Sequence, residues 1–126
     1  MKGVRMSLPE QPIESHDVHS RRLIRHAEEM LESGDRLQAS EKAWGAVAHR
    51  LKVVADNRGW KYETHTDAFT LVRNLDREQR NPRIRILFDV AHGLHNNYYK
   101  DTRPIDYIRE QIADVKELLL ILERIE

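Results

Sequence analysis

The stretch AHGLHNNYY, residues 91–99, gathers the side chains of this chain that are best suited to chemistry. It contains His92 and His95, and a histidine changes its charge near neutral pH, so that it can accept or donate a proton. Arg85 precedes them and carries a guanidinium group, which can bind a phosphate through two hydrogen bonds. These three side chains suit cleavage of an RNA phosphodiester without a metal ion, in which the 2′-hydroxyl attacks the adjacent phosphorus.

The residues around these histidines predict a helix that starts at the cap Asn81, with Pro82 in its first turn, and runs to about Tyr99. Side chains three and four positions apart share a helix face. That spacing predicts a polar ridge made of Arg85, Asp89, His92, Asn96 and Tyr99. It predicts an apolar stripe made of Ile84, Leu87, Phe88, Ala91, Leu94 and Tyr98, with His95 between ridge and stripe. We expect His92, His95 and Arg85 to act in catalysis, and the substrate to be bound by Asp89, Asn96, Asn97, Tyr98 and Tyr99.

Other interpretations of the histidines stay open. A half-buried His95 can serve only to hydrogen-bond a neighbouring helix, and His92 can be an incidental surface residue. The i, i+3 spacing of this pair, and of His16 and His19, also suits a zinc ion. Neither pair has an obvious third ligand, and HExxH, GxSxG and phosphate-binding glycine motifs are absent, so we expect no metal and no cofactor. Two isolated histidines are expected to be structural, namely His26 and His49.

The composition predicts a single globular domain. The chain has 126 residues, of which 40% are hydrophobic and 33% are charged, and this suits one core under a charged surface. It contains no cysteine, which excludes disulfides and thiolate metal sites and fits the cytoplasm, where we expect the protein. No apolar run approaches the roughly 18 residues of a membrane span. Residues 1–17 lack the apolar stretch of a secretory signal.

The charges balance overall but not locally. There are 21 basic and 21 acidic residues, so the net charge is zero and the chain as a whole does not attract nucleic acid. Between Arg73 and Arg85, however, five arginines accompany only Asp76 and Glu78. A polyanion would be expected to bind there, unless these side chains are merely the solvated faces of helices.

Helix start and stop signals divide the chain into five helices after a flexible lead, residues 1–15. The helices are expected over about 17–32, from the cap Asp35 to about 57, from Thr64 as a short helix, over about 82–99, and from Pro104 to the end. Because the connections are short, neighbouring helices should be antiparallel. The sequence therefore predicts an all-α, up-and-down bundle of four long helices and one short helix, forming one domain over residues 16–126.

Apolar spacing predicts which faces of these helices are buried. Trp44 lies at the centre of the stripe of the second helix and should be in the core, whereas Trp60 should be partly exposed in the loop that follows. The last helix is apolar on two sides, which favours two neighbours, one of them in a second copy of the chain, so we expect a homodimer. Three residues of the short helix should face inward, namely Phe69, Val72 and Leu75.

Two segments of the chain resemble a known group of small helical bundles. GDRLQASEKAWGAVAHRLKVVA, residues 34–55, followed by LHNNYY, residues 94–99, is similar to the HEPN superfamily. It is closest to the archaeal PaREP-type branch, in which a GD…QA.EK.W.A helix is followed by a helix that ends in LH.NFY. The resemblance covers roughly residues 20–125 and implies a HEPN-like bundle. The matching residues are Gly34, Asp35, Gln38, Ala39, Glu41, Lys42, Trp44, Ala46, Leu94, His95, Asn97, Tyr98 and Tyr99.

The resemblance also implies a function. Many HEPN proteins are metal-independent ribonucleases with an arginine, four to six residues and then a histidine, at a site formed across a dimer. Arg85 and His92 match the longest spacing, whereas the position counted back from His95 holds Asp89 or Val90. The resemblance implies a nucleotide- or RNA-binding protein. The activity it implies is that of an endoribonuclease of toxin–antitoxin or defence type, and the partner it implies is a nucleotidyltransferase-type protein. The alternative is a non-catalytic helical interaction module, an adaptor or antitoxin-like partner that acts through its dimer or ridge surface.

Overall fold

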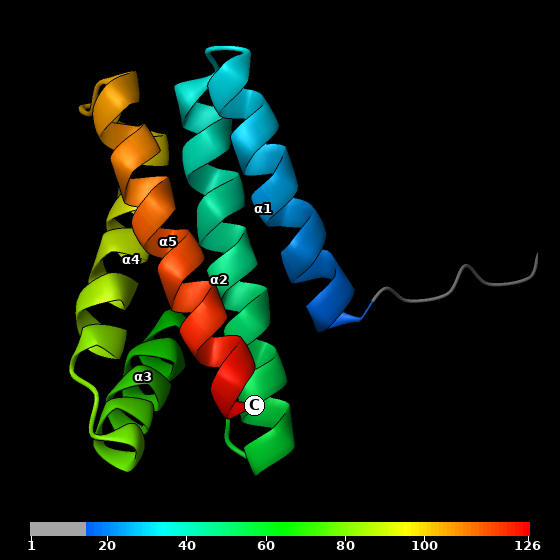
Figure 1. Cartoon of the computed structure of the whole chain (residues 1–126). Coiled ribbons are helices and arrows are strands. Elements are labelled where there is room, and N and C mark those ends of the chain that lie inside the picture. The colour runs from blue at the N-terminus through cyan, green and yellow to red at the C-terminus, as the bar shows by residue number, and fades with distance from the viewer. Residues whose placement is uncertain (1–14) are drawn as a thin grey trace, which may run out of the picture.

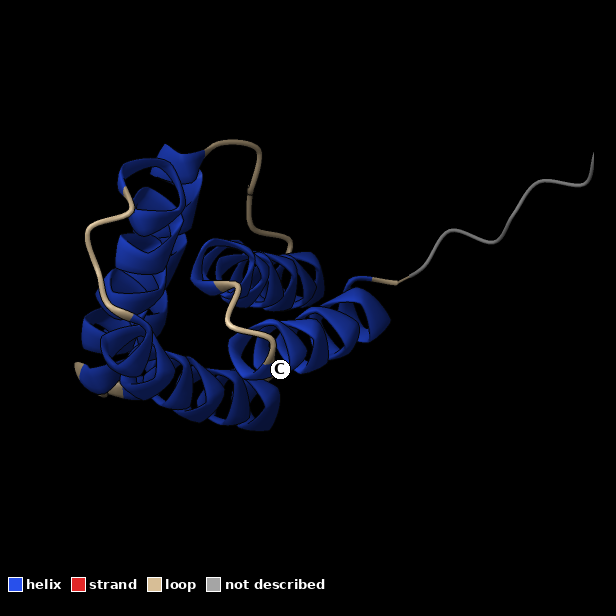
Figure 2. Cartoon of the chain, turned by 90° about the horizontal axis from the view of Figure 1, so that it is seen from above, coloured by secondary structure: helices blue, strands red, loops and turns tan. Residues whose placement is uncertain are grey.

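The computed structural model describes residues 15–126, which form five α-helices joined by short loops (Figure 1). The predicted N-terminal lead, residues 1–15, lies outside the described residues except for Ser15. The described residues contain no strand, so the predicted all-α class is confirmed (Figure 2). The helices are α1 His16–Glu32, α2 Arg36–Arg58, α3 His65–Gln79, α4 Arg83–Lys100 and α5 Ile105–Ile125.

The helices begin at the predicted caps. The side chain of Ser15 accepts a hydrogen bond from the backbone N–H of Val18, and Asp35 accepts one in the same way at the start of α2. Asp35 makes only this half of a capping box. Each bond satisfies a backbone donor that has no partner inside the helix. At α4 the helix starts one residue later than expected, at Arg83, but the Asn81 side chain still accepts from the Arg83 N–H at 3.2 Å.

The third helix is longer than the sequence predicts. A reciprocal capping box between Thr64 and Asp67 starts α3 at His65, and the helix continues for 15 residues, only two fewer than α1. Arg80 then ends it in the left-handed conformation, at φ 51°. The inward positions Val72 and Leu75 are buried as predicted. Phe69 is not, because it lies at the edge of the face that packs on α4 and is 43% exposed.

The central element of the bundle is α2, which contacts each of the other four helices. In Figure 1 α1 lies beside α2, α5 crosses in front of α2, and α3 lies at the lower end near α4. Small residues on α2 let α1 approach closely. Gly45 lies so near Leu23 that an added Cβ would be 3.1 Å from a methyl group of that leucine, and Ser20 donates a 2.7 Å hydrogen bond to the Ala46 carbonyl.

One chain buries most of the two-sided apolar face of α5. This helix contacts α1, α2 and α4, so that Leu118 and Leu119 are both in the core. Of the leucines in this stretch only Leu120 stays open to solvent, with 54% of its surface exposed. The sequence predicts that a second copy of the chain covers one side of this apolar face, but helices of the same chain cover most of it.

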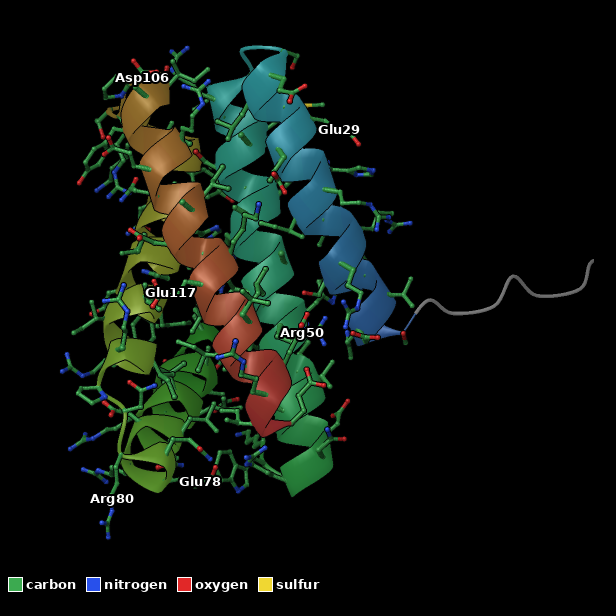
Figure 3. The ribbon with its side chains drawn as sticks, viewed as in Figure 1. Glu29, Arg50, Glu78, Arg80, Asp106 and Glu117 are labelled. Carbon is green, nitrogen blue, oxygen red and sulfur yellow. The ribbon has the colours of Figure 1, made fainter. Side chains whose placement is uncertain are left out.

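A buried arginine joins the two ends of the described chain to the middle of α2. Arg50 is 1% exposed, and its Nη1 lies 2.7 Å from carboxylate oxygens of both Asp17 and Glu126 (Figure 3). Glu123 lies 3.6 Å from the other terminal nitrogen. The hydrogen bond that Arg50 donates to Asp17 is the main cause that lowers the pKa of Asp17. Within residues 15–126, no helix combines the length and apolar character that a membrane span requires.

Candidate functional site

Trp44 of α2 forms the floor of an aromatic cluster in which three histidines meet. The indole is 6% exposed, which confirms that Trp44 belongs to the core. Its ring centroid lies 5.6 Å from that of His65, 5.5 Å from that of His92 and 5.3 Å from that of His95. Phe88 packs beside it at 5.8 Å. Core packing thus fixes the surface on which the histidine rings rest.

The three histidines come from two helices. His92 and His95 lie one turn apart on α4, with ring centroids separated by 6.0 Å. His65, the first residue of α3, is exposed and lies 5.9 Å and 5.1 Å from those two rings. We call these three residues the histidine cluster. One chain therefore brings together three imidazoles that approach from both sides of the α3–α4 contact.

A carboxylate of α2 orients one of these rings. His95 Nδ1 lies 2.8 Å from Oε1 of Glu41, and both side chains are partly buried. A carboxylate can only accept a hydrogen bond, so Nδ1 must be the donor and carries the proton. The other nitrogen, Nε2, then remains to exchange a proton with a ligand. Glu41 also stabilises the positive charge of the ring whenever both nitrogens are protonated.

His92 favours its neutral form. Burial lowers the pKa of His92 below its usual value, and the neighbouring His95 and His65 lower it further, against a smaller opposite effect of Asp89. A neutral imidazole can accept a proton at neutral pH. The cluster therefore places a proton acceptor, His92, next to an oriented imidazole, His95, within one helical turn.

Two exposed aromatic rings flank the histidine cluster. Phe69 of α3 makes an edge contact with His92 at 5.0 Å between ring centroids and is 43% exposed. Tyr99 makes an edge contact with His95 at 5.5 Å and is 72% exposed. Exposed rings of this kind provide surfaces on which nucleobases can stack.

The comparisons with known proteins identify the family. The model of the archaeal PaREP1/PaREP8 family matches residues 18–119. The chain is a member of this family. A crystal structure of a Sulfolobus solfataricus protein superposes with a TM-score of 0.76 at 21% identity, covering 90% of this chain and 98% of that chain, and so shows the same fold. No curated protein matches the sequence.

In this PaREP1/PaREP8 protein, Arg85 does not join the histidine cluster. Its position seven residues before His92 corresponds to a rise of about 10 Å along α4. Its Nε instead lies 3.4 Å from Asp76 of α3, and the side chain is 54% exposed. Asp89 and Asn96 are exposed on α4, and Tyr98 is half-buried, with its ring against that of Tyr99.

Asn97 is built into the fold and is not available to a ligand. It is 2% exposed, and its Oδ1 accepts 3.0 Å hydrogen bonds from the backbone N–H groups of Thr102 and Arg103. Its Nδ2 donates to Ser40 of α2 at 3.2 Å. The expected substrate-binding role therefore does not fit Asn97, because two of these bonds hold the α4–α5 connection and the third joins α4 to α2.

Sequence reasoning missed two members of the site. His65 lies in ETHTD, a segment whose pattern predicts the loop and cap before a short helix, and no helical spacing links it to residues 92 and 95. Glu41 lies within the family-like motif QASEKAW, where it matched without being given a role. Among residues 15–126, no set of three or more histidine or acidic side chains is arranged to hold a metal ion.

A second group of histidines lies at the α1–α2 contact. Nδ1 of His16 is 2.9 Å from Nδ1 of His49, and the His19 ring stacks on His49 at 4.0 Å between centroids. Burial is the main cause that lowers the pKa of His49, and together with the nearby charges of His19, Lys52, His16 and Arg22 it brings this pKa to about 4. His49 is therefore not isolated, although its place inside the bundle fits the structural role expected for it.

The stability of the fold should decrease as the pH falls from about 6.5 to 4, partly because of His49. Below pH 6.5 the unfolded chain protonates this ring while the folded chain does not, so protons favour unfolding until the folded pKa of about 4 is reached. We expect His49→Gln to remove about 1–2 kcal/mol of this decrease, less than the shift alone implies, since the ring is partly solvated.

Urea denaturation across this pH range would measure the effect, with His26→Gln as the control. His26 is a half-buried histidine of α1, so this variant makes the same replacement at a second place in the bundle. Equal pH dependence in wild type and His49→Gln would show that His49 does not couple folding to protonation.

Proposed function

We propose that this protein binds single-stranded RNA at the histidine cluster and cleaves it without a metal ion. The observation that supports this function best is the convergence of His65, His92 and His95 on Trp44, with Glu41 orienting His95. Exposed Phe69 and Tyr99 on either side would stack bases. The likeness to the HEPN superfamily, in which many members cleave RNA, agrees with this proposal.

In the proposed reaction, neutral His92 takes the proton of the 2′-hydroxyl as its oxygen bonds to phosphorus. His95, protonated on Nε2 and held by Glu41, gives a proton to the 5′-oxygen as the bond from phosphorus to that oxygen breaks. His65 faces the pair from α3 and stabilises the charge of the phosphorane. The products are a 2′,3′-cyclic phosphate and a free 5′-hydroxyl. Because His65 supplies the third imidazole, the reaction does not require a histidine from a second copy.

The test is incubation of the purified protein with end-labelled single-stranded RNA in EDTA between pH 6 and pH 8. Products that end in a 2′,3′-cyclic phosphate would support the proposal. If no cleavage exceeds that of a variant with alanine at positions 92 and 95, catalysis is excluded under these conditions. Binding of uncleaved RNA in that case would leave a nucleotide- or RNA-binding role, and absence of binding would favour the interaction module, with a nucleotidyltransferase-type protein as one candidate partner.

We further propose that two copies of the chain associate through the groove between α1 and α5. This groove has a volume of about 310 Å³, and Ile24, Leu119 and the exposed Leu120 contribute its apolar lining. Light scattering should give about twice the mass of one chain. The protein concentration should be tens of micromolar, a level at which an obligate dimer stays associated. Leu120→Asp should shift the protein to monomer, whereas Ile86→Asp, at a similarly exposed apolar residue of α4, should not. A monomeric wild type would rule out this dimer.

A further inference from the structure

Three of the five arginines between Arg73 and Arg85 have no acidic partner among residues 15–126. Arg83 forms an ion pair with Glu117, and Arg85 with Asp76. The other acid of this stretch, Glu78, accepts two hydrogen bonds from Arg58 of α2. Every acid of this stretch is therefore already paired, and the unpaired arginines are Arg73, Arg77 and Arg80.

These three arginines continue the line of residues that begins at the histidine cluster. Along α3, His65, Phe69, Arg73 and Arg77 follow one another at intervals of four residues, each turned by about 40° from the one before. Arg80 ends the helix, and its azimuth falls between those of Phe69 and Arg73. All three arginines are exposed, and Figure 3 shows Arg80 at the lower end of the molecule, extending away from the ribbon. We call Arg73, Arg77 and Arg80 the arginine stripe.

At its His65 end, this line of residues reaches the histidine cluster, where the proposed reaction takes place. Phe69 touches both Phe88 and His92 with its ring, so the stripe is continuous with the histidine cluster along the α3–α4 contact. From His65 to Arg80 the rise along the helix is about 22 Å, and successive arginines are separated by about 4.5–6 Å of rise. Long, flexible side chains at this spacing can reach successive groups of a negatively charged polymer.

We propose that the arginine stripe binds the backbone phosphates of the RNA strand whose reacting phosphate lies at the histidine cluster. This inference rests on the proposed function and adds to it the path of the strand and a minimum length. The ligand must be a polyanion several nucleotides long, since a mononucleotide at the cluster cannot reach Arg77 or Arg80. The net charge of the chain is zero, so the chain as a whole does not attract RNA. The local surplus of positive charge on the arginine stripe would therefore determine where the strand binds.

The experiment measures binding of a fluorescent 2′-O-methyl oligoribonucleotide, which lacks the attacking hydroxyl and stays intact. The stripe variant Arg73→Gln/Arg77→Gln/Arg80→Gln should bind a strand of about 12 nucleotides about 10–100-fold more weakly than wild type at low salt. The dependence of log K on log salt should become shallower by about 2, since each lost phosphate contact removes about 0.7. A mononucleotide should bind wild type and the stripe variant equally.

The matched control removes the same charge from other exposed arginines, and circular dichroism verifies the fold of both variants. Binding close to that of wild type is expected of the control, in which glutamine replaces Arg25, Arg109 and Arg124. Equal loss in both variants would attribute the effect to net charge, and wild-type affinity in the stripe variant would show that the strand takes another path. Either result overturns the stripe alone, whereas a wild type that binds no RNA at low salt overturns the proposed function as well.

Discussion

Replacement of His92 with alanine should lower the rate of RNA cleavage by about 10²–10⁴-fold, the usual effect of removing a general base. The ring is the proton acceptor of the proposed reaction, since burial and two neighbouring histidines lower the pKa of His92 and keep it neutral. A base with a lowered pKa stays deprotonated in weak acid. The rising limb of the wild-type pH–rate profile should therefore lie below pH 6.5, the ordinary value for histidine.

The measurement is single-turnover cleavage of labelled RNA, with His26→Ala as the control. His26 is a half-buried histidine of α1 that is not a member of the histidine cluster. Glu41→Gln should also slow the reaction, because the amide removes the charge that stabilises protonated His95. The rising limb of the pH profile should stay in place in this variant, because Glu41 is not among the groups that shift the pKa of His92. Unchanged rates in His92→Ala would exclude this residue as the base and with it the mechanism.

Trp44→Ala should reduce the free energy of unfolding by about 3–5 kcal/mol, the usual effect of deleting a large buried aromatic side chain. The indole is 6% exposed and packs against Phe88 and all three rings of the histidine cluster. Its loss leaves a void at the centre of α2 that the surrounding helices fill only in part. Chemical denaturation, followed by the circular dichroism signal of the helices, would measure this free energy of unfolding.

Trp60→Ala is the matched control and should cost less. Trp60 is half-buried after α2, where it packs at the margin of the core and the Arg58 guanidinium lies 5.5 Å from its ring centroid. A loss below about 1 kcal/mol for Trp44→Ala would mean that this indole is not part of the core. Because the histidines rest on Trp44, we also expect the folded fraction of Trp44→Ala to lose cleavage activity.

The fold could be predicted because its signals are local. Ser15, Asp35 and Thr64 are caps whose partners lie three residues away, and apolar spacing placed Trp44, Leu87 and Leu94 in the core. Spacing was less informative at the margins of a face. Phe69 and Asn97 show this, because the packing of another helix decides whether such a residue is covered.

The site was only half predictable. His92 and His95 are three residues apart and share a helix face, so the sequence alone could pair them. His65 and Glu41 reach the same place from α3 and α2, at separations of 27 and 54 residues from the histidines they approach. Such contacts depend on how the helices cross, which no periodicity within one helix encodes. The ridge also suggested a role for Arg85 beside His92, but the rise of α4 separates the two.

The buried Arg50 also determines how the ends of the bundle open. Terminal turns usually fray independently of each other. Here Asp17 in the first turn of α1 and Glu126, the residue that follows the last turn of α5, both pair with one guanidinium inside the protein. Opening either turn leaves a buried charge with fewer partners, a state that costs several kcal/mol. We therefore expect these two turns, far apart in the chain, to open as one cooperative unit anchored on α2. Amide hydrogens in both turns should then exchange with solvent through the same opening event.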